Sequence, residues 1–151
     1  MADCFRGPEQ LEAQTAARAL GFIPRCAFRK AGAELRHLDE KPSSAFAEAI
    51  RTLLWSLRLE FGQARTKVVL ITSAQPGEGK TTIASSLAAT QGRAGKKVLL
   101  IDADLRRPAV HERFGHSRSP GLVDYLSGQC TPGQIHNHNE AMPGVSVISA
   151  G

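Results

Sequence analysis

Apolar positions along the chain form patterns of two kinds. From Ser43 to Gly62 they recur every three or four residues, which predicts an amphipathic helix whose first turn a serine can cap. Segments 67–72 and 97–101 are instead nearly continuous aliphatic runs, and such runs are typical of parallel strands that are buried on both faces. The apolar face of the predicted helix consists of Phe46, Ile50, Leu53, Leu57 and Phe61, with Leu54 beside them.

The order of the remaining segments indicates the fold class. A glycine-rich loop follows the first aliphatic run at once, and we expect a helix from Thr81 to about Gly92 after this loop. A short helix over 121–126 and a third apolar run over 145–148 come after the second aliphatic run. This β-α-β-α-β alternation predicts an α/β fold with a parallel sheet and right-handed crossovers.

Residues 1–42 are expected to form an N-terminal appendage, ahead of a domain that occupies residues 43–151. Segment 9–20 is rich in alanine and predicts a short helix. We expect this helix to end before Pro24, because proline cannot continue a helix. The charged run 25–41 has little periodicity, so we expect much of this region to be loose by itself.

Composition narrows the class of protein. The chain has 151 residues, of which 42% are hydrophobic and 5% aromatic, so one domain with an aliphatic core is expected. The net charge of +5 is a mild basic excess without a dense Lys/Arg run or interleaved aromatic residues. Nucleic acid is therefore not expected as a partner, while an anionic membrane surface stays open. Three scattered cysteines, Cys4, Cys26 and Cys130, and a polar N-terminus indicate a reduced, cytoplasmic protein.

The glycine-rich loop has the residues of a phosphate-binding loop. Gly77 and Gly79 allow the backbone to approach a phosphate closely, and the start of the next helix adds N–H groups and a favourable dipole. Lys80 can reach the β- and γ-phosphates, and Thr81 can offer its hydroxyl to Mg²⁺. The carboxylate of Glu78 must point away from the phosphates. The candidate nucleotide-binding residues are Gln75, Pro76, Gly77, Glu78, Gly79, Lys80, Thr81 and Thr82.

A second motif, Asp-Ala-Asp-Leu-Arg, stands at the end of the run 97–101. Asp102 would lie at the carboxyl end of a strand, where open α/β sheets bind ligands and where a carboxylate can hold Mg²⁺ through its waters. Asp104 is placed to accept a proton from an incoming hydroxyl, and Arg106 could pair with a carboxylate or a phosphate. The alternative is that Asp102 and Asp104 merely cap the next turn.

Together these motifs resemble those of the bacterial tyrosine kinases that accompany polysaccharide co-polymerases of capsule and exopolysaccharide export. The resemblance lies in Pro-Gly-Glu-Gly-Lys-Thr at 76–81, Asp-Ala-Asp-x-Arg at 102–106, Gly-Leu-x-x-x-Leu-x-Gly at 121–128 and Leu-Gly-Phe-Ile-Pro at 20–24. It implies a three-layer P-loop sandwich with a mostly parallel sheet, incomplete in this chain. It also implies transfer of the γ-phosphoryl group of Mg·ATP to a protein tyrosine, with catalytic roles for Lys80, Asp102 and Asp104 and metal ligation by Thr81 and Asp102.

The resemblance implies partners as well, and the chain departs from the family in several places. An inner-membrane co-polymerase or activator segment would be the partner, at the cytosolic face of that membrane. The family's oligomerisation motif, Glu-x-x-Arg-x-x-Arg, keeps Glu48 and Arg51 but has Leu54 in the last position, so ring assembly is in doubt. The Walker B aspartate and the tyrosine tail have no counterpart before Gly151, so the chain would be the front part of a kinase domain.

Two other functions stay open at this point. A non-catalytic nucleotide-binding regulator of polysaccharide export would need neither the Walker B aspartate nor the tyrosine tail. A partition or site-selection ATPase would share the fold, but its signature lysine early in the loop is absent from 74–76. Tyr125 is expected to pack in a core helix rather than accept a phosphoryl group, and Trp55 to pack or to contact a partner. A metal site is not expected at the loosely spaced histidines His111, His116, His136 and His138.

Overall fold

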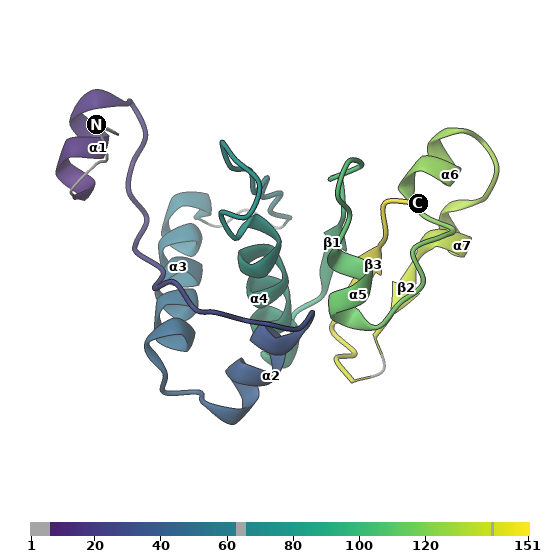
Figure 1. Cartoon of the computed structure of the whole chain (residues 1–151), viewed down its shortest axis with the longest axis horizontal. Coiled ribbons are helices and arrows are strands. Elements are labelled where there is room, and N and C mark those ends of the chain that lie inside the picture. The colour runs from purple at the N-terminus through teal and green to yellow at the C-terminus, as the bar shows by residue number, and fades with distance from the viewer. Residues whose placement is uncertain (1–6, 63–65, 140) are drawn as a thin grey trace.

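The computed structural model describes residues 7–62, 66–139 and 141–151, so Cys4 lies outside the described residues. Within the described residues four helices precede the first strand, three further helices follow it, and two strands come last (Figure 1). In chain order the elements are α1 (Pro8–Gln14), α2 (Ala33–Glu40), α3 (Ala45–Phe61), α4 (Lys80–Arg93), β1 (Val98–Ile101), α5 (Val110–Phe114), α6 (Leu122–Leu126), α7 (Pro132–Ile135), β2 (Asn137–His138) and β3 (Val145–Ile148).

Helix α3 confirms the helix predicted from the apolar periodicity. The Ser44 hydroxyl accepts a hydrogen bond from the Ala47 N–H at 3.2 Å, which satisfies one of the unpaired donors of the first turn. Phe46 and Ile50 are buried and form a core with Leu87 of α4. Trp55 is exposed on the outer face, under the guanidinium of Arg58. Helix α3 is therefore fixed against the helix that carries the glycine-rich loop.

The sheet has three strands in the order β1-β3-β2. β1 and β3 are parallel, with Val98 opposite Val145 and Ile101 opposite Ile148, so the predicted parallel pairing and the predicted strand 145–148 are confirmed. Helix α4 packs on both strands, above a core that contains the fully buried Val145 and Val147. The antiparallel strand β2 was not predicted, because two residues are too few to show a periodicity. The strand predicted over 97–101 is present as β1, but the expectation that it is buried on both faces is wrong, because Leu99 and Ile101 are exposed.

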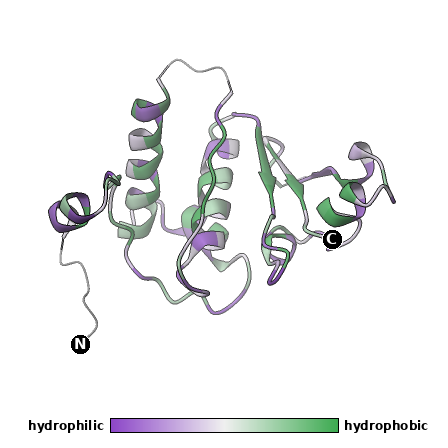
Figure 2. Cartoon of the chain, turned by 90° about the horizontal axis from the view of Figure 1, so that it is seen from above, coloured by the Kyte–Doolittle hydropathy of each residue, from purple (hydrophilic) through white to green (hydrophobic). Residues whose placement is uncertain are grey.

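The expectation of a buried strand over 67–72 is wrong for the described chain. This segment forms no strand, and Val68 and Leu70 are 85% and 84% exposed. Figure 2 shows the apolar stretch as a coil without an arrow alongside α4. The physical reason is that a parallel strand needs a neighbour for its N–H and C=O groups, and no described strand pairs with this segment.

The expectation that residues 1–42 are mostly loose is wrong for Ala33–Glu40, which form α2. Leu35 lies in the same buried core as Val110 and Val145, and Glu34 is fully buried in an ion pair with Arg113. The sequence hid this helix because the charges of segment 25–41 find their partners far along the chain. Helix α1, in contrast, is shorter than the predicted helix 9–20, and Figure 1 shows it at the edge of the molecule.

Helix α6 confirms the predicted short helix, but it is not a core helix. None of its residues is buried, and Tyr125 is 41% exposed. The carboxylate of Asp124 accepts a hydrogen bond from the Gly121 N–H at 2.7 Å, so a local contact holds the helix start. The expectation that Tyr125 packs in the core is therefore wrong, and its side chain is accessible from solvent.

Candidate nucleotide-binding site

The glycine-rich loop presents a run of unpaired backbone donors. Gly79 caps α4 with a φ of 95°, and Gly77 has a φ of 84°, a left-handed conformation that favours glycine at both positions. The N–H groups from Gly77 through Thr82 have no hydrogen-bond acceptor within the described chain. Because N–H groups at a helix start attract anions, this run is a ready-made site for phosphate oxygens.

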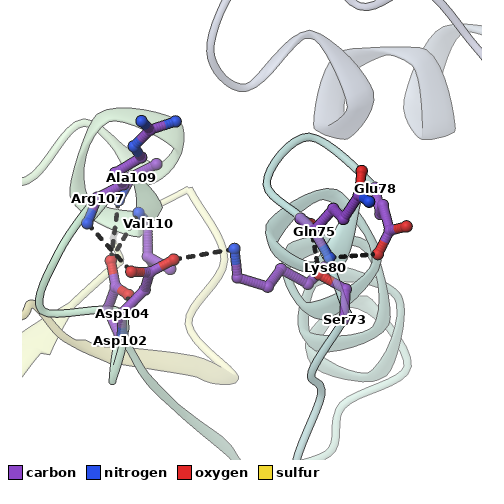
Figure 3. Close-up of polar contacts among 9 residues, drawn as sticks. All are labelled: Ser73, Gln75, Glu78, Lys80, Asp102, Asp104, Arg107, Ala109 and Val110. Atoms are coloured by element: carbon purple, nitrogen blue, oxygen red, sulfur yellow. Dashed lines mark hydrogen bonds and ion pairs between the residues drawn. The ribbon is translucent and has the colours of Figure 1, made fainter.

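Glu78 closes the loop on itself, with its carboxylate turned away from Lys80. Its Oε2 accepts a hydrogen bond from the Gln75 N–H at 2.9 Å, and the Ser73 hydroxyl donates to the Gln75 carbonyl at 3.0 Å. Figure 3 shows these contacts on the side of the loop opposite Asp104. The carboxylate thus holds the loop's shape while leaving the donors from Gly77 onward open.

Lys80 connects the loop to the end of β1. Its Nζ lies 2.9 Å from Oδ2 of Asp104, and both side chains are partly exposed. The other carboxylate oxygen of Asp104 accepts a hydrogen bond from the Arg107 N–H at 3.0 Å. The hydrogen bond from Lys80, followed by the one from Arg107, lowers the pKa of Asp104. The two motifs predicted from the sequence therefore form one site, as Figure 3 shows.

Asp102 organises the loop that follows β1. Its Oδ1 accepts a hydrogen bond from the Asp104 N–H at 3.1 Å, and its Oδ2 accepts from the N–H groups of Ala109 and Val110, each at 3.0 Å. The carboxylate is buried, and these bonds start helix α5. The structure thus shows that Asp102 caps the turn after β1, as the alternative in the sequence analysis expected. A carboxylate has about four acceptor positions, and these hydrogen bonds use three of them.

We expect Asp102→Asn to destabilise the chain by about 1–3 kcal/mol, because the amide NH₂ would face N–H donors where an acceptor is required. Chemical denaturation measures this loss. Asp39→Asn is the matched control, since Asp39 pairs with Arg93 on the surface and such pairs contribute about 0–1 kcal/mol. Equal unfolding free energies for the two variants would contradict the structural role of Asp102.

The other predicted residues are distributed around this centre. Thr81 follows Lys80 in the first turn of α4, and Thr82 lines a hollow of about 210 Å³ together with Arg113. Arg106 takes part in none of the ion pairs found in the described chain. The structure also adds groups that residue types did not reveal, the backbone N–H groups of Arg107, Ala109 and Val110. The signal for them was the alternative that Asp102 and Asp104 cap the next turn.

No histidine takes part in the contacts described above for Lys80, Asp102 and Asp104. His136 and His138 have ring centroids 4.5 Å apart, while burial lowers the pKa of His116 after α5. Within residues 7–62, 66–139 and 141–151, no three His, Cys, Asp or Glu side chains are grouped so that they could hold a metal ion. Among the same residues, no helix has the length and the apolar character needed to cross a membrane.

Comparisons with known proteins agree with this geometry. Residues 69–124 match the family model for the CobQ/CobB/MinD/ParA nucleotide binding domain. The chain is 39% identical over 125 residues to EpsB of Ralstonia solanacearum, which is named as a candidate tyrosine-protein kinase. This match covers 82% of this chain and 16% of EpsB. It is 45% identical over 86 residues to the tyrosine-protein kinase YwqD of Bacillus subtilis, covering 57% of this chain and 36% of YwqD.

A solved structure gives the same relationship. The kinase domain of the Escherichia coli tyrosine kinase ETK superposes with a TM-score of 0.83 at 33% identity, covering 96% of this chain and 59% of that chain. The chain therefore spans only part of the relatives that it matches. The P-loop fold expected from the sequence is confirmed by these matches. The chain belongs to the family of the bacterial tyrosine kinases and carries their nucleotide-binding fold.

Proposed function

We propose that this chain binds Mg·ATP and supplies the phosphate-binding part of a protein tyrosine kinase that acts in exopolysaccharide or capsule biosynthesis. The observation that carries the proposal is the run of unpaired N–H groups from Gly77 through Thr82, with the Lys80 ammonium beside it. Such a run can bind the phosphate chain from one side while Lys80 approaches from the other.

Lys80 has two competing anionic partners in this proposal. Without nucleotide, Asp104 neutralises the ammonium across the 2.9 Å contact. When phosphates occupy the loop, Lys80 turns to them and releases the Asp104 carboxylate. Since the hydrogen bond from Lys80 is the largest cause of the lowered pKa of Asp104, its loss raises that pKa and makes Asp104 a stronger base. Asp104 can then accept the proton of a tyrosine hydroxyl.

The oxygen donors beside the loop fit Mg²⁺. Thr81 offers a hydroxyl from the first turn of α4, and Asp102 has one acceptor position left over after its three backbone hydrogen bonds. We expect Thr81 to bind the ion directly and Asp102 to bind it through water. When bound, the ion neutralises charge on the β- and γ-phosphates. The same buried carboxylate then serves the loop and the metal together.

A phosphotransfer assay with Asp104→Asn tests the proposal. Labelled ATP and a glutamate–tyrosine copolymer serve as substrates, in a Tyr125→Phe background that removes the chain's single tyrosine. We expect ATP to bind about two- to fivefold more tightly, because Lys80 loses a competing partner worth about 0.2–1 kcal/mol. Transfer to tyrosine should fall about a hundredfold or more, because the base is lost.

The outcomes separate the alternatives. Transfer by the asparagine variant at the parental rate would exclude Asp104 as the base, and Asp39→Asn is the control for loss of a surface carboxylate. If the chain binds ATP but labels no tyrosine even when it is joined to the remaining part of a kinase domain, the non-catalytic regulator replaces the kinase. Hydrolysis of ATP without any transfer would favour a partition-type ATPase.

We further propose that Glu48 and Arg51, which pair with each other on α3, take part in self-association. This self-association would take place at the cytosolic face of the inner membrane, next to a co-polymerase partner.

A further inference from the structure

A shallow groove lies beside α2, next to the hollow that Thr82 lines, since Phe28, Arg29 and Lys30 line both. It has a volume of about 380 Å³ and is formed by the segment that leads into α2 and by one face of that helix. None of its lining residues belongs to the glycine-rich loop. The aromatic and basic side chains of its lining are Phe28, Arg29, Lys30, Arg36, His37 and Lys41.

The walls of the groove carry an excess of positive charge. Arg29, Lys30, Arg36 and Lys41 are all exposed, and none of them takes part in an ion pair found within the described residues. Glu40 is the only acidic residue of the lining. Like charges that gather without counter-charges repel one another, so an anion in the groove would relieve this repulsion.

The floor of the groove is held in place by the core. The Phe28 ring stands edge-on to the buried Phe46 at 5.1 Å and to His37 at 5.5 Å. His37 in turn lies 3.0 Å from the hydroxyl of Ser44, which caps α3. Because the floor is already ordered, a ligand that binds there meets little cost of ordering the protein.

We propose that this groove binds a phosphate group, carried either by an anionic lipid headgroup or by a soluble phosphate compound. Guanidinium groups match phosphate oxygens with paired N–H donors, and two arginines face the groove beside two lysines. The Phe28 ring can contact the apolar part of the molecule that carries the phosphate. The site is additional to the nucleotide loop and does not depend on kinase activity.

The test compares two charge-matched double variants. Arg29→Gln/Arg36→Gln removes two charges from the groove, and Lys96→Gln/Lys97→Gln removes two exposed charges before β1. Pyrophosphate binding is measured by calorimetry in a Lys80→Met background, so that the nucleotide loop contributes little. Lipid binding is measured by sedimentation with phosphatidylcholine vesicles, with and without phosphatidylglycerol. We expect the groove variant to lose about tenfold or more in affinity, and the control to lose little.

Each outcome decides one part of the proposal. Loss of pyrophosphate binding in the groove variant supports a soluble phosphate, and loss of vesicle binding supports a lipid headgroup. Absence of binding to both probes, or an equal loss in both double variants, would overturn the proposal. Tighter binding to polyglutamate than to either phosphate probe would reassign the groove to an acidic peptide. Thermal melts of the variants check that the fold is intact, as expected for exposed side chains.

Discussion

Lys80→Met should weaken Mg·ATP binding by roughly 10- to 150-fold, the largest effect on nucleotide affinity that we expect from a single substitution. The ammonium lies beside the unpaired N–H groups of the loop, and a hydrogen bond to a charged group contributes about 1.5–3 kcal/mol. The variant also leaves Asp104 without its cationic partner, so a free carboxylate then faces the phosphates. Calorimetric titration with Mg·ATP measures the change.

The double variant Lys80→Met/Asp104→Asn separates these two contributions. If repulsion by Asp104 adds to the loss, the second substitution should restore part of the affinity. Lys97→Met is the control, since this lysine is exposed and pairs with no carboxylate in the described chain. Unchanged affinity in Lys80→Met would remove the loop from the nucleotide site and with it the proposed function.

Val145→Lys/Val147→Lys should unfold the chain, whereas the same two substitutions at Val68 and Leu70 should leave its melting temperature unchanged. The β3 side chains are fully buried, and two buried charges without partners cost several kcal/mol each, comparable with the whole stability of a domain. The side chains at 68 and 70 are almost fully exposed and lie on no described strand. Thermal unfolding followed by circular dichroism measures both effects.

The exposed run has a second expected consequence. Val68, Leu70, Leu99 and Ile101 expose apolar surface that favours association. We expect the parent chain to bind a hydrophobic dye and to self-associate in light scattering, and Val68→Lys/Leu70→Lys to reduce both. Because the chain spans only part of the kinases that it matches, we also expect it to transfer phosphoryl groups poorly by itself. A strongly destabilised Val68→Lys/Leu70→Lys variant would show that this segment is packed rather than exposed.

Much of the candidate site could be predicted because its parts are local in sequence. The glycines, Lys80 and the helix start are consecutive, and a helix cap depends on bonds over three or four residues. The strand ending before Asp102 was likewise visible as an aliphatic run. The contact between Lys80 and Asp104 was not visible, because it depends on how α4 crosses β1. Nor could residue types show that Asp102 holds the N–H groups of Ala109 and Val110.

The sequence by itself determined the class of fold, the phosphate-binding loop and the helix α3, since each depends on short-range periodicity or on adjacent residues. Tertiary structure decided which aliphatic runs are buried, and it paired 145–148 with β1 but left 67–72 without a partner. It also decided the place of α2, whose Glu34 pairs with Arg113. The physical reason is that burial and ion pairing depend on the neighbours that folding brings together, and a local pattern of residues does not contain them.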